Sequence, residues 1–167
     1  LSLYYAFATT VGTFALQGWH TDYYDLLASG WLRGHLYLPI DPEPSLLRRA
    51  DPFDYAFADK WLWDASLYKA RYYLYWGPVP GLWLLIFKLL TQLPDTIYDQ
   101  WLVLWFMLLR LYAGAALIVL YLRRQAPELP GWVAPLAILV FAIANPTPYF
   151  VARPMIYEAS IAAGQAF

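Results

Sequence analysis

The sequence has no cysteine and few charged residues. Only 14% of its 167 residues are Asp, Glu, Lys or Arg, whereas soluble domains carry about 25%. The missing cysteine excludes disulfides, thiolate metal sites and cysteine nucleophiles. A net charge of −1 leaves no basic field for a nucleic-acid backbone. Because 61% of the residues are hydrophobic and 20% are aromatic, the composition favours a membrane protein over a soluble enzyme.

The charges that are present gather in one part of the chain. Fourteen of the 23 charged residues lie between residues 20 and 71, and residues 1–17 carry none. Apolar stretches long enough to cross about 30 Å of hydrocarbon flank this polar block. The chain also starts and stops inside apolar runs, so we expect it to be a fragment of a longer membrane protein.

These patterns predict an all-α fold, a polytopic transmembrane helix bundle with a large first extracytoplasmic loop that contains short juxtamembrane helices. The expected parts are a truncated first transmembrane helix (1–17), the extracytoplasmic loop (18–98), a transmembrane helix (99–122), a cytoplasmic loop (123–130), a transmembrane helix (131–150), and an extracytoplasmic loop with the start of the next helix (151–167).

The positive-inside rule orients the predicted spans. Arg123 and Arg124 lie in a short loop between two spans, which the rule places in the cytoplasm. The apolar run at residues 78–93 contains Lys88 and is short for a span. If it crossed the membrane, the two arginines would lie on the same side as the six Lys and Arg of the polar block. We therefore expect this run to lie in the membrane interface.

Inside the polar block, local signals predict short helices. Thr21 or Asp22 can cap a helix over residues 22–33, which Gly34 would end. Asp64 follows a tryptophan-rich stretch. Burial there would raise its pKa and make it a possible proton carrier, but a helix cap before the following alanine is the simpler prediction.

The order of these segments resembles a known enzyme superfamily. An acidic helix start is followed by Gly34-His-Leu-Tyr-Leu, and then by Tyr72-Tyr-Leu-Tyr-Trp-Gly-Pro-Val-Pro-Gly-Leu before a short apolar helix. This arrangement resembles the GT-C membrane glycosyltransferases, which include protein mannosyltransferases and the lipid A aminoarabinose transferase. The resemblance covers nearly the whole chain in order and topology. It implies transfer of a sugar from a polyprenyl-phosphate donor to an extracytoplasmic acceptor, in a bacterial inner membrane.

The resemblance also implies a catalytic acid at the start of the first extracytoplasmic loop. Asp22, followed by Tyr24 and Ala28, is the best match, and Asp25 is the alternative. The spacing in better-known members would place His20 at this position, and His20 lies close enough to Asp22 to join a site. The family's acid deprotonates or orients the acceptor nucleophile. The competing interpretation is that Asp22 only caps a helix.

A second acid is expected after the third span. Glu158 matches the family's acid in the second extracytoplasmic loop, with Arg153 five residues before it, although the family more often has Asp there. Carboxylates of Asp22 and Glu158 converging from two loops could hold a divalent metal ion or position a phosphate-bearing donor through one. No other cofactor is expected. The competing interpretation is that Glu158 is a solvated residue of a short loop.

Basic and aromatic residues suggest where a lipid phosphate would bind. Lys69 and Arg71 next to Tyr73 suit a phosphate at headgroup level, although snorkelling side chains at an interface have the same composition. Arg110, in the middle of a predicted span, should face the bundle and find a partner such as an acid or a lipid phosphate. The rival function is a non-catalytic polytopic membrane protein, a transporter or an assembly subunit, whose loop acids bind ions or partners.

Overall fold

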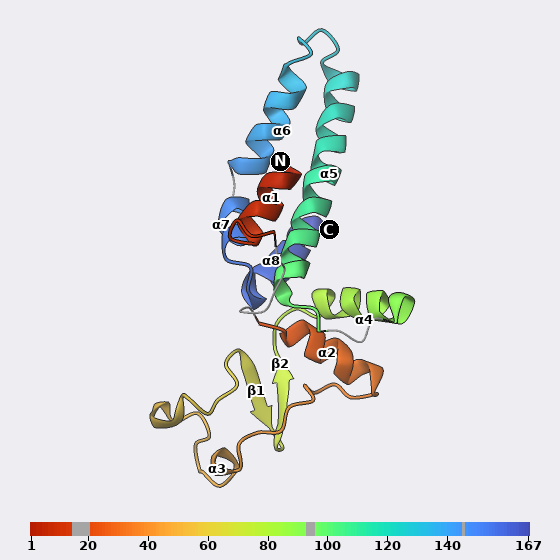
Figure 1. The fold of residues 1–167 in the computed structure, drawn as a ribbon. Coiled ribbons are helices and arrows are strands. Elements are labelled where there is room, and N and C mark those ends of the chain that lie inside the picture. The colour runs from red at the N-terminus through yellow and green to blue at the C-terminus, as the bar shows by residue number, and fades with distance from the viewer. Residues whose placement is uncertain (15–20, 93–95, 145) are drawn as a thin grey trace. The chain divides into compact units, whose positions relative to one another are not determined.

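The computed structural model describes residues 1–14, 21–92, 96–144 and 146–167, and most of them are helical (Figure 1). The chain divides into two units: residues 1–21 with 97–167, and residues 22–96. Unit 1 contains five helices among its described residues: α1 (Ser2–Thr9), α5 (Asp99–Gln125), α6 (Val133–Ile143), α7 (Thr147–Ala152) and α8 (Ile156–Ala166). Unit 2 contains α2 (Tyr23–Leu32), α3 (Pro44–Leu47), the 3₁₀ helix η1 (Tyr55–Phe57), the strands β1 (Ala65–Tyr68) and β2 (Arg71–Leu74), and α4 (Val79–Thr91). The expectation of a mainly helical chain is confirmed.

One helix is long and apolar enough to cross a membrane, counted over the described residues. This is α5, with 27 residues and a mean hydropathy of 2.1 in its most apolar window. At 1.5 Å per residue it is about 40 Å long. The apolar helices α4 and α6 have 13 and 11 residues and are shorter than a single span needs. A bundle of several spans therefore stays a prediction.

Two predicted spans differ from the helices observed. The helix expected over residues 1–17 ends at Thr9, and Gly12 follows in the left-handed region at φ +81°. The span expected over residues 131–150 is divided, because α6 ends at Ile143 and α7 begins after Pro146. Proline lacks a backbone N–H and restricts the residue before it, which explains why one helix does not continue through this point.

In unit 1, α5 packs against α1, α6, α7 and α8, and α5 and α6 lie side by side (Figure 1). Gly114 of α5 allows the close approach of α6, because a Cβ there would lie 2.3 Å from Cε1 of Phe141. Arg110 lies over the same Phe141 ring at 4.2 Å from its centroid and donates to Thr147 Oγ1 at 2.9 Å. Arg110 thus faces the bundle as expected, and the partners found here are a ring and a hydroxyl.

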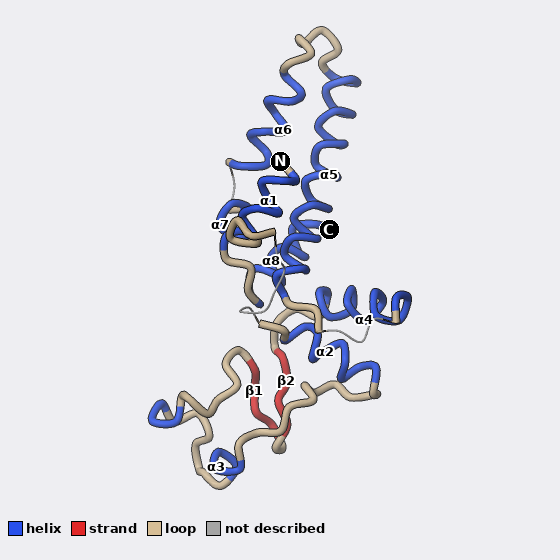
Figure 2. Tube along the Cα trace, in the orientation of Figure 1, coloured by secondary structure: helices blue, strands red, loops and turns tan. Residues whose placement is uncertain are grey.

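In unit 2, the two strands form an antiparallel hairpin, drawn red in Figure 2. The fold is therefore mostly α rather than all-α, and the predicted helix cap at Asp64 is wrong, because a strand begins at Ala65. Lys69 and Ala70 form the two-residue turn, with φ of 47° and 58°. Positive φ at both central residues is what a type I′ hairpin turn requires.

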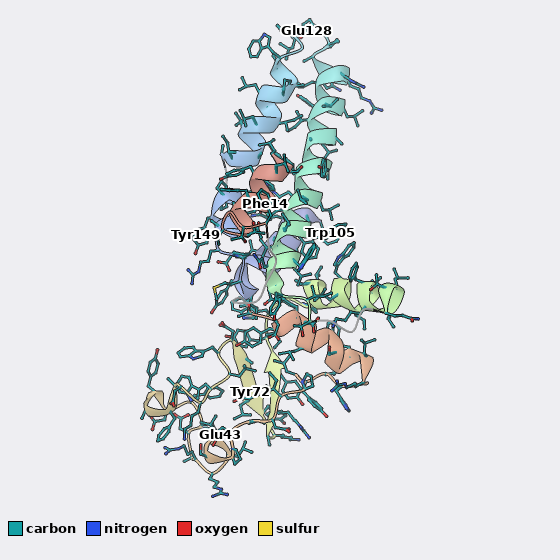
Figure 3. The ribbon with its side chains drawn as sticks, in the orientation of Figure 1. Phe14, Glu43, Tyr72, Trp105, Glu128 and Tyr149 are labelled. Carbon is teal, nitrogen blue, oxygen red and sulfur yellow. The ribbon has the colours of Figure 1, made fainter. Side chains whose placement is uncertain are left out.

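One face of the hairpin is buried in unit 2. Tyr72 of β2, labelled in Figure 3, points from the hairpin of unit 2. It is 2% exposed, and its carbonyl accepts a hydrogen bond from the N–H of Leu38 at 2.8 Å. Leu27 of α2 and Leu84 of α4 are also buried. The hairpin and the α2–α4 pair thus contribute to the apolar core of this unit.

The helix predicted over residues 22–33 is confirmed as α2. Asp22 is at its N-cap position, and Gly34 follows its C-cap residue at φ +76°. Gly30 on α2 lies close to the segment that follows, because a Cβ there would be 2.6 Å from the carbonyl oxygen of Tyr37. A side chain at position 30 would force this segment away from the helix.

Candidate functional site

Asp22 begins α2 without capping it. It occupies the N-cap position, but its side chain makes no capping hydrogen bond. Burial raises the pKa of the half-buried Asp22 carboxyl above its ordinary value; a hydrogen bond from its own N–H opposes this rise, and the charge of Asp25 adds to it. A carboxylate that is not engaged as a cap, with a raised pKa, is suited to accept a proton from a substrate hydroxyl.

Asp25, the alternative acid, is tied to another helix. Its Oδ1 lies 2.7 Å from Nζ of Lys88 on α4, and both side chains are 7% exposed. An acid held in a buried ion pair is poorly placed to meet a substrate, because leaving the pair would separate two opposite charges in a place without water. Of the two acids, Asp22 is therefore the one whose carboxylate is not held in a buried ion pair.

Sequence reasoning missed the role of Lys88. A usable signal was present, because Lys88 is the only charged residue of α4 and Asp25 is the only charged residue of α2. Opposite charges standing alone on two otherwise apolar helices are expected to pair, since neither can be buried by itself.

Arg71 and Tyr73, two of the residues predicted to bind substrate, share one face of the hairpin. The register pairs Tyr68 with Arg71 and Ser66 with Tyr73, so these four side chains lie on the same side. Tyr37 completes the group: the Arg71 guanidinium lies 4.7 Å from its ring centroid, and the Tyr73 ring packs against it edge-on at 6.3 Å.

The two basic residues of this surface have different surroundings. Arg71 donates to Asp41 Oδ1 at 3.0 Å, in an exposed ion pair of the kind that contributes little stability. A phosphate could therefore take the place of Asp41. Lys69 is exposed at the hairpin turn, with its ammonium 5.2 Å from the ring centroid of Tyr68. Lys69, Arg71 and Tyr73 thus lie along one hairpin. Its two cations could contact a phosphate, and its aromatic rings could contact an apolar group beside that phosphate.

In unit 1, Glu158 is buried in the first turn of α8. It is 4% exposed, and its Oε2 has no hydrogen-bond partner among the described residues. The alternative of a solvated loop residue is therefore wrong. Arg153 is exposed and donates to the Tyr149 hydroxyl at 3.1 Å; this bond and the nearby Glu158 carboxylate raise the pKa of the guanidinium. A buried carboxylate oxygen without a donor is available to a cation or to a hydroxyl of a ligand.

The predicted metal site joins residues of different units. Asp22 belongs to unit 2 and Glu158 to unit 1, so their approach stays a prediction. Within the described parts of the chain, no three His, Asp or Glu side chains come together. The unpartnered Oε2 of Glu158 suits a hard cation such as Mg²⁺ or Ca²⁺, which prefers oxygen ligands. His20, the other residue predicted near Asp22, lies outside the described residues.

Comparison with known proteins identifies no relative. The sequence matches no protein-family model and no curated protein, and the fold matches no solved structure.

Proposed function

We propose that this chain is the N-terminal part of a polytopic membrane glycosyltransferase of the GT-C type, which transfers a sugar from a polyprenyl-phosphate donor to an extracytoplasmic acceptor. The enzyme belongs to the plasma membrane of a bacterium in this proposal, and its remaining spans lie in the C-terminal part of the same protein. The chain by itself would be inactive. The apolar helix α5 supports the membrane assignment, and the order of motifs supports the enzyme class.

One observation carries the proposal: two acids three residues apart have different surroundings. Asp25 is bound to Lys88 in a buried pair, whereas Asp22 sits at the start of α2 without making a capping bond. A residue that served only as a helix cap would be expected to use its carboxylate for that purpose. The proposal assigns the role of loop-one acid to Asp22 for this reason.

In the proposed reaction, Asp22 acts as the general base. Its carboxylate accepts the proton of the acceptor hydroxyl as the hydroxyl oxygen attacks the anomeric carbon of the donor sugar. A new bond forms between this oxygen and the anomeric carbon. The bond from the anomeric carbon to the phosphate oxygen breaks, and the polyprenyl phosphate leaves with both electrons of that bond.

The hairpin surface offers groups for the donor phosphate. Arg71 and Lys69 can give charge-assisted hydrogen bonds to phosphate oxygens, with Tyr37 and Tyr73 beside them. Aromatic side chains of this kind are typical of the membrane–water interface, where the phosphate of a lipid-linked sugar lies. A divalent ion held by Asp22 and Glu158, if bound, would neutralise charge on the departing phosphate.

Asp22→Asn in the full-length protein tests the proposal. Asn is as good an N-cap as Asp, and no capping bond is lost, so the unfolding temperature should not fall. Transfer from a panel of polyprenyl-phosphate sugars should fall by about 10²-fold or more, the scale expected for loss of a general base. Asp59→Asn, at an exposed acid of the same unit, is the matched control and should leave transfer unchanged.

Two other results would contradict the assignment. Full transfer by Asp22→Asn, with loss in a folded Asp25→Asn variant, would make Asp25 the reacting acid. If the wild-type protein transfers no sugar, and Asp22→Asn alters only the binding of an ion or a partner, the non-catalytic alternative is correct.

A further inference from the structure

α2 and α4 run antiparallel and meet at two points. At one point, Asp25 of α2 binds Lys88 of α4 at 2.7 Å. At the other, Gly81 of α4 leaves room for α2, because a Cβ there would lie 3.0 Å from Leu27 and 3.1 Å from Trp31. At 1.5 Å per residue, the two points are about 10 Å apart along α4 and about 3–9 Å apart along α2. The register of α2 against α4 is therefore defined at both points.

Stability alone does not explain a charged contact at this place. Both side chains are 7% exposed, so each charge has lost its water. Burying an ion pair costs about as much as the pair returns, and an apolar pair of similar size often holds two helices equally well or better. An ion pair differs from an apolar contact in favouring one register, because any slip separates the two opposite charges of this pair where water does not reach them.

The side of α4 that does not face α2 is apolar and exposed. The buried residues Gly81, Leu84 and Lys88 recur at helical spacing on one side. Away from them lie exposed residues without charge: Leu82, Ile86, Phe87, Leu89 and Leu90. An exposed face of this composition is typical of a helix that lies in a membrane interface.

We propose that the Asp25–Lys88 pair is a positioning device, which holds the start of α2 in register with the lipid-lying helix α4 and so keeps the Asp22 carboxylate at a fixed depth relative to the membrane surface. Lys88 is a positioning residue that touches no substrate. Asp25 has the same role. This inference rests on the proposed function for the identity of Asp22 as the reacting acid, but the register itself can be measured without any activity.

The experiment compares three variants of the full-length protein in vesicles of phosphatidylethanolamine and phosphatidylglycerol. Lys88→Met removes one charge, Asp25→Leu with Lys88→Met replaces the pair by an apolar contact, and Asp25→Lys with Lys88→Asp reverses it. Lys60→Met, at an exposed lysine of the same unit, is the matched control. A spin label at Ser29→Cys on α2 reports its depth in the bilayer by power saturation, and transfer of polyprenyl-phosphate sugars reports kcat and KM.

The label should shift in depth in Lys88→Met and in the apolar double variant, and return to its wild-type depth in the reversed pair. The apolar variant is the decisive one, because it is expected to fold as well as the wild type while losing the unique register. Its kcat should fall at least about tenfold with KM unchanged, since a displacement of about 1 Å can cost as much as 10²-fold. Lys60→Met should change neither reading.

A folded apolar double variant with wild-type label depth and wild-type kcat would overturn the inference. This result can be distinguished from failure of the proposed function. If Asp22→Asn abolishes transfer while the Asp25 and Lys88 variants leave label depth and kcat unchanged, the positioning role is wrong and the enzyme assignment stands. If the label shifts but no variant, including Asp22→Asn, affects transfer, the register is real and the enzyme assignment is wrong.

Discussion

Gly114→Ala tests the close packing of α5 against α6. The added Cβ would lie 2.3 Å from Cε1 and 2.4 Å from Cζ of Phe141, where ordinary contacts begin at 3.4 Å. The ring must therefore move by about 1 Å, at a cost of about 1–3 kcal/mol for overpacking. Moving it also weakens the contact with the Arg110 guanidinium, which is worth about 0.5–2 kcal/mol. Alanine recovers about 1 kcal/mol through its higher helix propensity.

The net result should be a loss of about 2 kcal/mol of stability, or roughly 4–8 °C in the thermal unfolding midpoint for a chain of this size. Thermal unfolding in detergent, followed by near-ultraviolet circular dichroism, measures this shift. Gly164→Ala in α8 is the matched control, because a Cβ there meets nothing within 4 Å. It should keep or raise the midpoint. Gly114→Ala with Phe141→Leu should recover part of the loss. Equal midpoints for the two alanine variants would refute the packing argument.

Three further predictions concern topology, the two acids and pH. Arg49→Cys and Arg124→Cys should be labelled from opposite faces of the membrane by an impermeant maleimide. Labelling of both from the same face would contradict the predicted topology, in which residues 18–98 are extracytoplasmic and residues 123–130 are cytoplasmic. Spin labels replacing Asp22 and Glu158 should report a separation compatible with carboxylates about 12 Å apart, close enough for a bridging ion after modest closure, and a separation of two helix diameters would remove the shared site. Burial raises the pKa of Asp22 in the folded state above its pKa in the unfolded state. Between these two pKa values the folded state binds more protons than the unfolded state. The contribution of Asp22 to the free energy of unfolding therefore falls as pH rises through this window. Asp22→Asn should remove this part of the decline in a pH series of unfolding midpoints, and an unchanged series would show that the carboxyl titrates alike in both states.

The sequence by itself determined the helices whose first and last residues are set by nearby residues in the chain. α2 begins after Asp22 and ends before Gly34, as the acidic start and the glycine predicted. α5 begins at Asp99, as expected from the apolar run, and ends at Gln125, three residues beyond the predicted span. Caps, helix-ending glycines and long apolar stretches act over a few residues, so a local pattern contains all the information needed to find them.

The hairpin was missed because its turn lacks the usual residues. Asn-Gly or Asp-Gly normally marks a two-residue type I′ turn, since both positions require positive φ. Here the turn is Lys69-Ala70, which carries no such signal. The strands around it were interpreted by composition as interfacial sequence. Pairing of Leu67 with Tyr72, and burial of Tyr72 in unit 2, fix the hairpin through contacts that a local pattern does not contain.

The different surroundings of Asp22 and Asp25 come from the tertiary structure alone. In the sequence both are acids near a helix start, and helical spacing does not tell which one another element will bind. The partner of Asp25 is Lys88, on a helix far along the chain, and the pair forms because α2 packs against α4, with Gly81 of α4 against Leu27 and Trp31 of α2. Burial of Glu158 is of the same kind, because it depends on α8 packing against α5. Local chemistry sets where a helix begins and ends, whereas the partner of a buried charge depends on which helices meet and in what register.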